Sequence, residues 1–344
     1  MLVPPAANRV YAATATRLTV AELEVLNATV FGHRLHDISQ QTIGGVAYVT
    51  FGVAGGGALR QDETAYLGNL SSGYALFRIV DEELLAPVEL ARLDRYDDDL
   101  ITIQKYQGKT NEQFTKLLLN VTVWSSSFGS QMLRRRLRVV DPLCGRGTTL
   151  NQAAMYGFDA AGLDHDRKDF DAYTAFLKTW LRRKHIKHQV STGPVRAHGQ
   201  LLGHRTEATF APTKAQYKAG DTQQLTAVAA DTTRVLDFFR PGEFDVLVAD
   251  APYGIQHGSR SPSAGLRRNP RELLTEAVPL WSQLLRPGGA LGISWNTYVA
   301  SRDQLTEVLT SAGLNVCDAE PYRGFEHWVD QAITRDLIIA YKAG

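Results

Sequence analysis

Four apolar segments that each end in an aspartate place the strongest constraint on the fold. They are LRVVD, DAAGLD, LTAVAAD and FDVLVAD, which end at Asp141, Asp164, Asp231 and Asp250. Segments with helical periodicity lie between them, and the strands lack the polar alternation of a half-exposed sheet. Buried strands that alternate with helices are typical of a parallel sheet covered on both faces, so we expect an α/β fold.

The first hundred residues have a different pattern. We expect strands at 9–16, 44–53 and 74–80, with helices at 19–31 and 61–71. This order resembles β-α-β-β-α-β, so residues 1–100 are predicted to form a smaller α+β module, of the ferredoxin-like kind. The acidic run Asp97–Asp99 is interpreted as the connection to a second domain at 105–344.

A polar segment at about 190–224 interrupts the second domain. It is interpreted as an insertion, a hairpin with short strands at 207–212 and 215–219.

The composition indicates the cellular compartment and argues against disulfide-rich, zinc-binding and membrane-spanning proteins. The chain has 344 residues, with 37 Lys plus Arg against 36 Asp plus Glu, so only local charge can identify a partner. Cys144 and Cys317 lie far apart without CxxC spacing, which argues against a disulfide framework or a zinc site. No apolar run reaches the ~18 residues of a membrane span. We therefore expect a cytoplasmic protein without a metal.

A glycine turn follows the first apolar segment, in DPLCGRGTT. Gly145 and Gly147 let the backbone approach a ligand closely, and Thr148 opens the next helix. The turn is not a P-loop, because no lysine follows, and Leu150 stands where a dinucleotide fingerprint has its third glycine. A tight strand-to-helix turn without a ligand is the alternative.

The aspartates at the strand ends suggest a nucleoside. Asp164 follows Gly145 by nineteen residues, where a carboxylate accepts hydrogen bonds from ribose hydroxyls, and Asp231 could accept from an adenine amino group. Each could instead cap a helix. Their joint position at strand ends favours the nucleoside.

Together, VVDPLCGRGTTL, GLDHD, VAADTT, VADAPYG and LLRPGGALGIS resemble the motif series of class I S-adenosylmethionine-dependent methyltransferases. Among these, residues 105–344 are similar to the THUMP-associated enzymes that methylate guanine N2 in tRNA. The resemblance implies a Rossmann-like, mostly parallel seven-stranded sheet whose last strand is antiparallel. It also implies S-adenosylmethionine as the cofactor. The implied cofactor residues are Phe114, Thr115, Asp141, Cys144, Gly145, Gly147, Thr148, Asp164, His165, Asp231 and Thr232.

The stretch DAPY has the groups that methylation of a base amino group needs. That nitrogen is a poor nucleophile, because its lone pair is delocalised into the ring. The Asp250 carboxylate and the Ala251 carbonyl could accept both amino hydrogens, while Pro252 fixes the turn and Tyr253 stacks on the base. The family pattern usually has proline where Ala251 stands, and this departure favours guanine. A plain strand-ending turn is the alternative.

Three basic stretches are candidates for contact with RNA. They are RRRLR at 134–138, RRKHIKH at 182–188 and a segment at 259–271. A solvated helix face explains the second nearly as well. The residues before Asn111 are too few for both the small module and a THUMP domain. RNA, with tRNA favoured, would then be captured by the module, the insertion, or a partner protein or homodimer.

Three further functions remain as alternatives. The same motif would serve an enzyme that methylates an amino group of rRNA or of DNA. A cofactor-binding subunit of an RNA-modifying complex would keep the fold without turnover. A nicotinamide-dependent dehydrogenase would need the missing third glycine.

Overall fold

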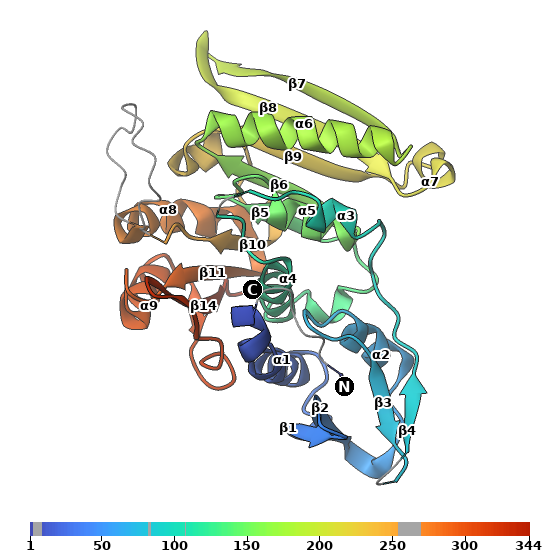
Figure 1. Ribbon diagram of the computed structural model, residues 1–344. Coiled ribbons are helices and arrows are strands. Elements are labelled where there is room, and N and C mark those ends of the chain that lie inside the picture. The colour runs from blue at the N-terminus through green and yellow to red at the C-terminus, as the bar shows by residue number, and fades with distance from the viewer. Residues whose placement is uncertain (3–8, 82–83, 107, 254–269) are drawn as a thin grey trace.

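The computed structural model describes residues 1–2, 9–81, 84–106, 108–253 and 270–344. A long mixed sheet crosses the molecule, with helices on both faces, and a smaller N-terminal module packs below it in Figure 1. Within the described residues the sheet has the strand order β12-β14-β11-β10-β5-β6-β9-β8-β7, with β13 paired to β14. Its strands are β5 (Arg138–Asp141), β6 (Asp159–Asp164), β7 (Lys187–Ala197), β8 (Gln200–Ala211), β9 (Gln223–Ala229), β10 (Phe244–Asp250), β11 (Leu285–Asn296), β12 (Asn315–Cys317), β13 (His327–Asp330) and β14 (Ile333–Tyr341).

The centre of the sheet is parallel and its last strand is antiparallel. Strands β11, β10, β5, β6 and β9 pair in parallel, whereas β14 pairs antiparallel with β11. This confirms the Rossmann-like class I methyltransferase fold expected from the motif series. The described sheet has ten strands rather than the expected seven, because β7, β8 and β13 are added to it. Because the strands are parallel, the ends of β5, β6, β9 and β10 lie at one edge of the sheet, which brings their terminal aspartates together.

Two hydrophobic cores cover the two faces. The side chain of Val139 packs into one core and that of Val140 into the other, as expected for neighbouring residues of a strand. Leu247 and Val248 of β10 divide in the same way. The helices of this region are α3 (Asp99–Thr102), α4 (Glu112–Trp124), α5 (Thr148–Met155), α6 (Arg167–Arg183), α7 (Lys214–Lys218), α8 (Pro270–Leu284) and α9 (Arg302–Ser311), with 3-10 turns η2 (Gly129–Gln131) and η3 (Thr232–Asp237).

The N-terminal module is α+β, but its first strand is misplaced in the prediction. Its elements are α1 (Arg9–Thr29), β1 (Leu35–Ile43), β2 (Val46–Val53), η1 (Ala54–Gly56), α2 (Gln61–Gly68), β3 (Leu76–Ile79) and β4 (Leu85–Val88). Residues 9–16 begin helix α1 rather than forming a strand. Leu2 takes the place of the first strand, because it bridges Tyr48 of β2 on one side and Ala75 beside β3 on the other. With this isolated bridge counted, the order of the described elements is β-α-β-β-α-β-β, and the ferredoxin-like arrangement stays a prediction.

The two parts of the chain share one core. Leu18 and Leu23 of α1 lie in the same buried cluster as Leu117 of α4. The division at residues 100 and 105 therefore stays a prediction.

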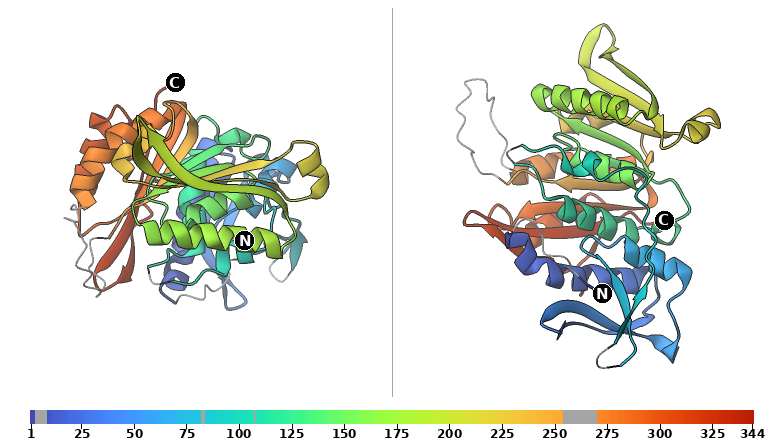
Figure 2. Two further views of the ribbon diagram at one scale, coloured as in Figure 1. Left: turned by 90° about the horizontal axis from the view of Figure 1, so that it is seen from above. Right: turned by 45° about the vertical axis from the view of Figure 1, so that its right-hand side comes forward.

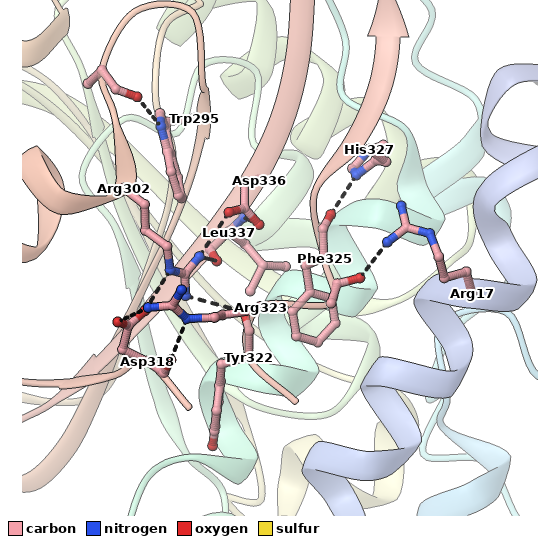
Figure 3. Close-up of polar contacts among 12 residues, drawn as sticks. Arg17, Trp295, Arg302, Asp318, Tyr322, Arg323, Phe325, His327, Asp336 and Leu337 are labelled. Carbon is pink, nitrogen blue, oxygen red and sulfur yellow. Dashed lines mark hydrogen bonds and ion pairs between the residues drawn. The ribbon is translucent and has the colours of Figure 1, made fainter. Parts of the chain in front are cut away.

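Helix α1 also holds the loop before β13, as Figure 3 shows. The Arg17 guanidinium donates to the Gly324 carbonyl at 2.9 Å and to that of Glu326. From the other side, Arg302 of α9 forms ion pairs with Asp318 and Asp336 at 2.8 Å. The N-terminal module thus fixes the entry to β13 and β14.

The polar insertion folds as a hairpin of β7 and β8, in which Lys187 pairs with Ala211 at the open end and Ala197 with Gln200 at the turn. Of its two predicted strands, 207–212 overlaps β8. The other, 215–219, is wrong, since helix α7 occupies it.

Candidate active site

A pocket of about 270 Å³ lies at the carboxyl ends of β5 and β10. It brings together ten of the predicted site residues: Phe114, Thr115, Asp141, Cys144, Gly145, Thr148, Asp250, Ala251, Pro252 and Tyr253. Gly147, Asp164, His165, Asp231 and Thr232 do not line it. Segments more than a hundred residues apart therefore meet in one cavity.

A larger pocket, of about 530 Å³, lies in the N-terminal module between β2 and β3. Among the described residues of its lining there is no carboxylate, imidazole or thiol, and Arg78 is the only charged side chain. Groups able to carry acid, base or acceptor chemistry gather in the smaller pocket, so we place the active site there.

The two glycines of the turn have different surroundings. Gly147 has φ +78°, and a Cβ there would lie 2.3 Å from the Tyr173 ring. Gly145 has φ +49°, but apart from its chain neighbours no atom of the described residues would lie within 4 Å of a Cβ there. Gly147 is therefore needed for packing, whereas Gly145 faces open space into which a ligand fits.

Asp141 and Asp164 are held by backbone amides of the loops that follow their strands. Asp141 is 2% exposed and accepts from the Leu143 amide at 2.9 Å, and burial raises its pKa to about 7. The two oxygens of Asp164 accept from the amides of Gly145, at 2.9 Å, and Asp166, at 2.8 Å. Burial raises the pKa of Asp164 as well. Each Asp164 oxygen retains one lone-pair position for a hydroxyl.

The residues at the end of β9 mainly serve the local structure. Asp231 caps η3 and accepts from the Thr233 amide at 2.8 Å. The buried Thr232 hydroxyl accepts from the Trp281 indole at 2.9 Å. His165 is exposed beside Asp164, with 3.8 Å between its Nδ1 and the carboxylate. The capping alternative thus holds for Asp231, and its contact with adenine stays a prediction.

Among the described residues, three hydrogen-bond donors reach Asp250. Its Oδ1 accepts from Ser294 Oγ at 2.7 Å and from the Tyr253 hydroxyl at 2.5 Å. Its Oδ2 accepts from the Thr110 hydroxyl. Since a carboxylate offers about four acceptor positions, one remains on Oδ2. Within the described residues, no donor reaches the neighbouring Ala251 carbonyl.

Tyr253 is fixed at both ends of its side chain. Burial raises its pKa well above the usual value, so the hydroxyl stays protonated and donates to Asp250. The Arg335 guanidinium lies 4.8 Å from the centre of the Tyr253 ring and 4.4 Å from that of Phe114. Arg335 is 6% exposed, so both cation–π contacts are desolvated and fix the two rings relative to each other.

Sequence reasoning missed several residues of the pocket. Thr110 lines it and donates to Asp250, as does Ser294 from behind the lining, and Tyr106 lines it with its hydroxyl 3.1 Å from that of Thr148. Arg146 packs over the Tyr106 ring at 4.7 Å and pairs with Asp169 at 2.8 Å. Ser294 alone left a signal, as a polar residue in the apolar run GALGISW.

One family model matches part of the chain, and several solved structures have a weak likeness to it. Residues 130–286 match the family described as RMKL-like, methyltransferase domain. No curated protein matches the chain. Among solved structures, a candidate RNA methyltransferase from Pyrococcus horikoshii aligns with 71% of this chain and 92% of its own, at 12% identity and a TM-score of 0.41. Magnesium protoporphyrin IX methyltransferase from Synechocystis, solved with S-adenosylmethionine, aligns with 69% and 87%, at 13% identity and a TM-score of 0.38.

The fold is that of class I methyltransferases, and the methyltransferase domain matched at residues 130–286 supports this activity, with S-adenosylmethionine as the cofactor. No group of side chains able to hold a metal ion, and no helix able to cross a membrane, occurs in the described part of the chain. Gly254 and the basic residues 259–269 lie outside the described residues.

Proposed function

We propose that this protein methylates an exocyclic amino group of a nucleic-acid base, namely guanine N2 in tRNA. One observation carries the proposal. The Asp250 carboxylate, with an acceptor position left on Oδ2, stands beside the Ala251 carbonyl in the pocket that Gly145 also lines. Two acceptors for one amino group therefore lie beside the expected cofactor site.

The cofactor fits the residues at the ends of β5 and β6. Gly145 leaves room for the methionine part, Asp141 offers a carboxylate to its ammonium group, and Asp164 has acceptor positions for the ribose hydroxyls. When bound, S-adenosylmethionine supplies an electrophilic methyl group. The protein's own task is to hold this group and the amino nitrogen in line.

The chemistry at the base depends on orientation. If Asp250 accepts one amino hydrogen and Ala251 the other, the nitrogen lone pair is rotated out of conjugation with the ring and can attack the methyl group. Asp250 is preorganised for this, because Ser294 and Tyr253 fix its other oxygen. Fixed donors and acceptors of this kind need no rearrangement during the reaction.

The rest of the DAPY segment is arranged so that a flat substrate, such as a base, can stack on it. The Ala251 amide donates to the Ser294 carbonyl at 2.9 Å, which anchors the turn to β11. The cation–π contact of Arg335 holds the Tyr253 ring, so that a base can stack on it. Ala251, which stands where adenine-methylating enzymes mostly have proline, favours guanine. The match to an RMKL-like methyltransferase domain favours RNA.

The experiment is to incubate the protein with methyl-labelled S-adenosylmethionine and unmodified tRNA, rRNA or DNA, and to identify the labelled nucleoside after digestion. We expect N2-methylguanosine from tRNA. Label in methyladenine, in rRNA or in DNA would contradict the substrate while keeping the amino-group chemistry. Bound cofactor without label in any nucleic acid would contradict the enzyme and favour a non-catalytic subunit.

A further inference from the structure

The region around the β7–β8 hairpin has an unusual charge. Residues 178–218 contain nine Lys or Arg and a single acid, Glu207, although the whole chain has 37 basic against 36 acidic residues. The rest of the chain is therefore net negative. Such a concentration of positive charge in one insertion is typical of a surface that binds a polyanion.

This charge gathers where three elements meet. The last turn of α6, the start of β7 and helix α7 lie together, and the Lys187 ammonium is 5.9 Å from the Tyr217 ring of α7. Figures 1 and 2 show these elements at the outer end of the sheet, beyond β9. Five exposed side chains form what we name the basic edge: Arg182, Arg183, Lys187, Lys214 and Lys218.

The basic edge lacks acidic partners. Within the described residues, no ion pair involves any of its five members. The stretch 134–138 is different, since Arg135, Arg136 and Arg138 pair with Asp245, Asp221 and Glu243. Three of the four arginines of that stretch are therefore neutralised within the fold, whereas the basic edge keeps its charge for an outside ligand.

The hairpin connects the basic edge with the side of the sheet that holds the pocket. Strand β7 has 11 residues, a length of roughly 36 Å at about 3.3 Å per residue. Ala229 at the end of β9 pairs with His204, so residues 200–203 of β8 extend past the carboxyl end of β9. The exposed Arg196 and His198 lie at this turn. Positive charge thus occurs at both ends of the hairpin.

We propose that the basic edge binds the phosphate backbone of the RNA substrate, at a distance from the base that is methylated. A single nucleotide could not reach both places, whereas a folded RNA could. An added protein strand fits less well. Pro194 removes a donor from β7, and Lys187 and Arg196 place charge along it, which are features that discourage strand addition. The inference rests on the proposed function, because it assumes an RNA substrate.

The test uses the full chain and a fluorescent tRNA transcript, with binding measured by anisotropy over a range of salt concentrations. The double variant Arg182→Glu and Lys187→Glu should bind about tenfold more weakly, with a shallower salt dependence. The matched control, Arg92→Glu and Arg240→Glu, changes two exposed arginines elsewhere and should bind like the parent. Equal loss in both double variants, or no loss in the first, would overturn the proposal.

Two additional comparisons distinguish RNA from an acidic protein as the partner, and the basic-edge proposal from the proposed function. A parent that binds polyglutamate as well as tRNA would overturn RNA in favour of an acidic protein. Binding is measured without methyl transfer, so tRNA binding through the basic edge with no transfer would contradict the proposed function alone. Methylation of tRNA at parental rates by the first double variant, with unchanged binding, would contradict the basic edge alone.

Discussion

Ser294 of β11 donates a 2.7 Å hydrogen bond to Oδ1 of Asp250 at the end of β10. The two residues are partners in the parallel pairing of these strands. The pairing of the two strands therefore fixes one oxygen of the carboxylate, while Thr110 and Tyr253 hold it from outside the sheet.

Substituting Ser294→Ala should lower turnover. A hydrogen bond to a charged group is worth about 1.5–3 kcal/mol, which corresponds to roughly a 10- to 100-fold loss of kcat if its whole value acts in the transition state. Cofactor affinity should stay near that of the parent. Ser282→Ala, which removes another buried hydroxyl on α8, is the control for general effects on the fold. An unchanged kcat in Ser294→Ala would show that Asp250 needs no fixed orientation.

Cofactor binding should depend on pH through Asp141. Burial raises its pKa from 3.8 to about 7, so it is largely protonated below that pH in the free protein. If the carboxylate form holds the methionine ammonium, affinity falls as pH drops below 7, by up to about tenfold per pH unit. Calorimetric titration with S-adenosylmethionine from pH 6 to 8 measures this. Asp141→Asn should bind weakly with a flat profile, and a parent that is equally flat would contradict the ionic contact.

The two glycines of the turn should respond differently to alanine. Gly147→Ala meets the Tyr173 ring and should destabilise the fold by about 2 kcal/mol or more. Gly145→Ala should lower stability only through the strain of its φ of +49°, but its methyl group would occupy the open space. Thermal unfolding and cofactor titration separate the two effects. We expect Gly145→Ala to lose more affinity than stability, and the reverse result would show that the open space holds no ligand.

Glu22 of α1 should stabilise the contact between the N-terminal module and α4. It is fully buried and accepts from Ser71 Oγ at 2.6 Å and from the Asn120 amide at 2.8 Å. Glu22→Ala leaves both donors without this partner, a cost of about 3 kcal/mol.

The cost should depend on pH. Burial raises the pKa of folded Glu22 above 4.5, so its stabilising effect is full below 4.5 and declines as pH rises through the folded value. Urea unfolding of parent and variant at pH 5 and pH 8 tests this, and a difference that grows with pH would contradict it.

The parallel sheet could be predicted because the pattern that indicates it lies within each strand segment. Val139, Val140, Leu247 and Val248 are apolar without alternation, which is what burial on two faces requires. The first strand was misplaced because residues 9–16 contain β-branched and aromatic side chains, and these propensities are weaker than tertiary packing. Ala15 and Leu18 are buried on the same helix, beside α4.

The partners of Asp250 could not be predicted in the same way. Thr110 is 140 residues from Asp250 in the chain and Ser294 is 44 residues away, so only the folded sheet and loop bring them together. For the same reason, the sequence could not show which basic stretch is neutralised by acidic side chains. Arg136 is neutralised by Asp221, 85 residues further on, whereas Arg182 has no such partner among the described residues.

The most direct test compares Asp250→Ala and Asp164→Ala by two measurements, the Kd for S-adenosylmethionine and the single-turnover rate of methyl transfer to tRNA. We predict that Asp250→Ala keeps the parental Kd while its rate falls by about 100-fold or more, and that Asp164→Ala weakens cofactor binding. Full activity in Asp250→Ala would contradict the assignment of this carboxylate to the amino group.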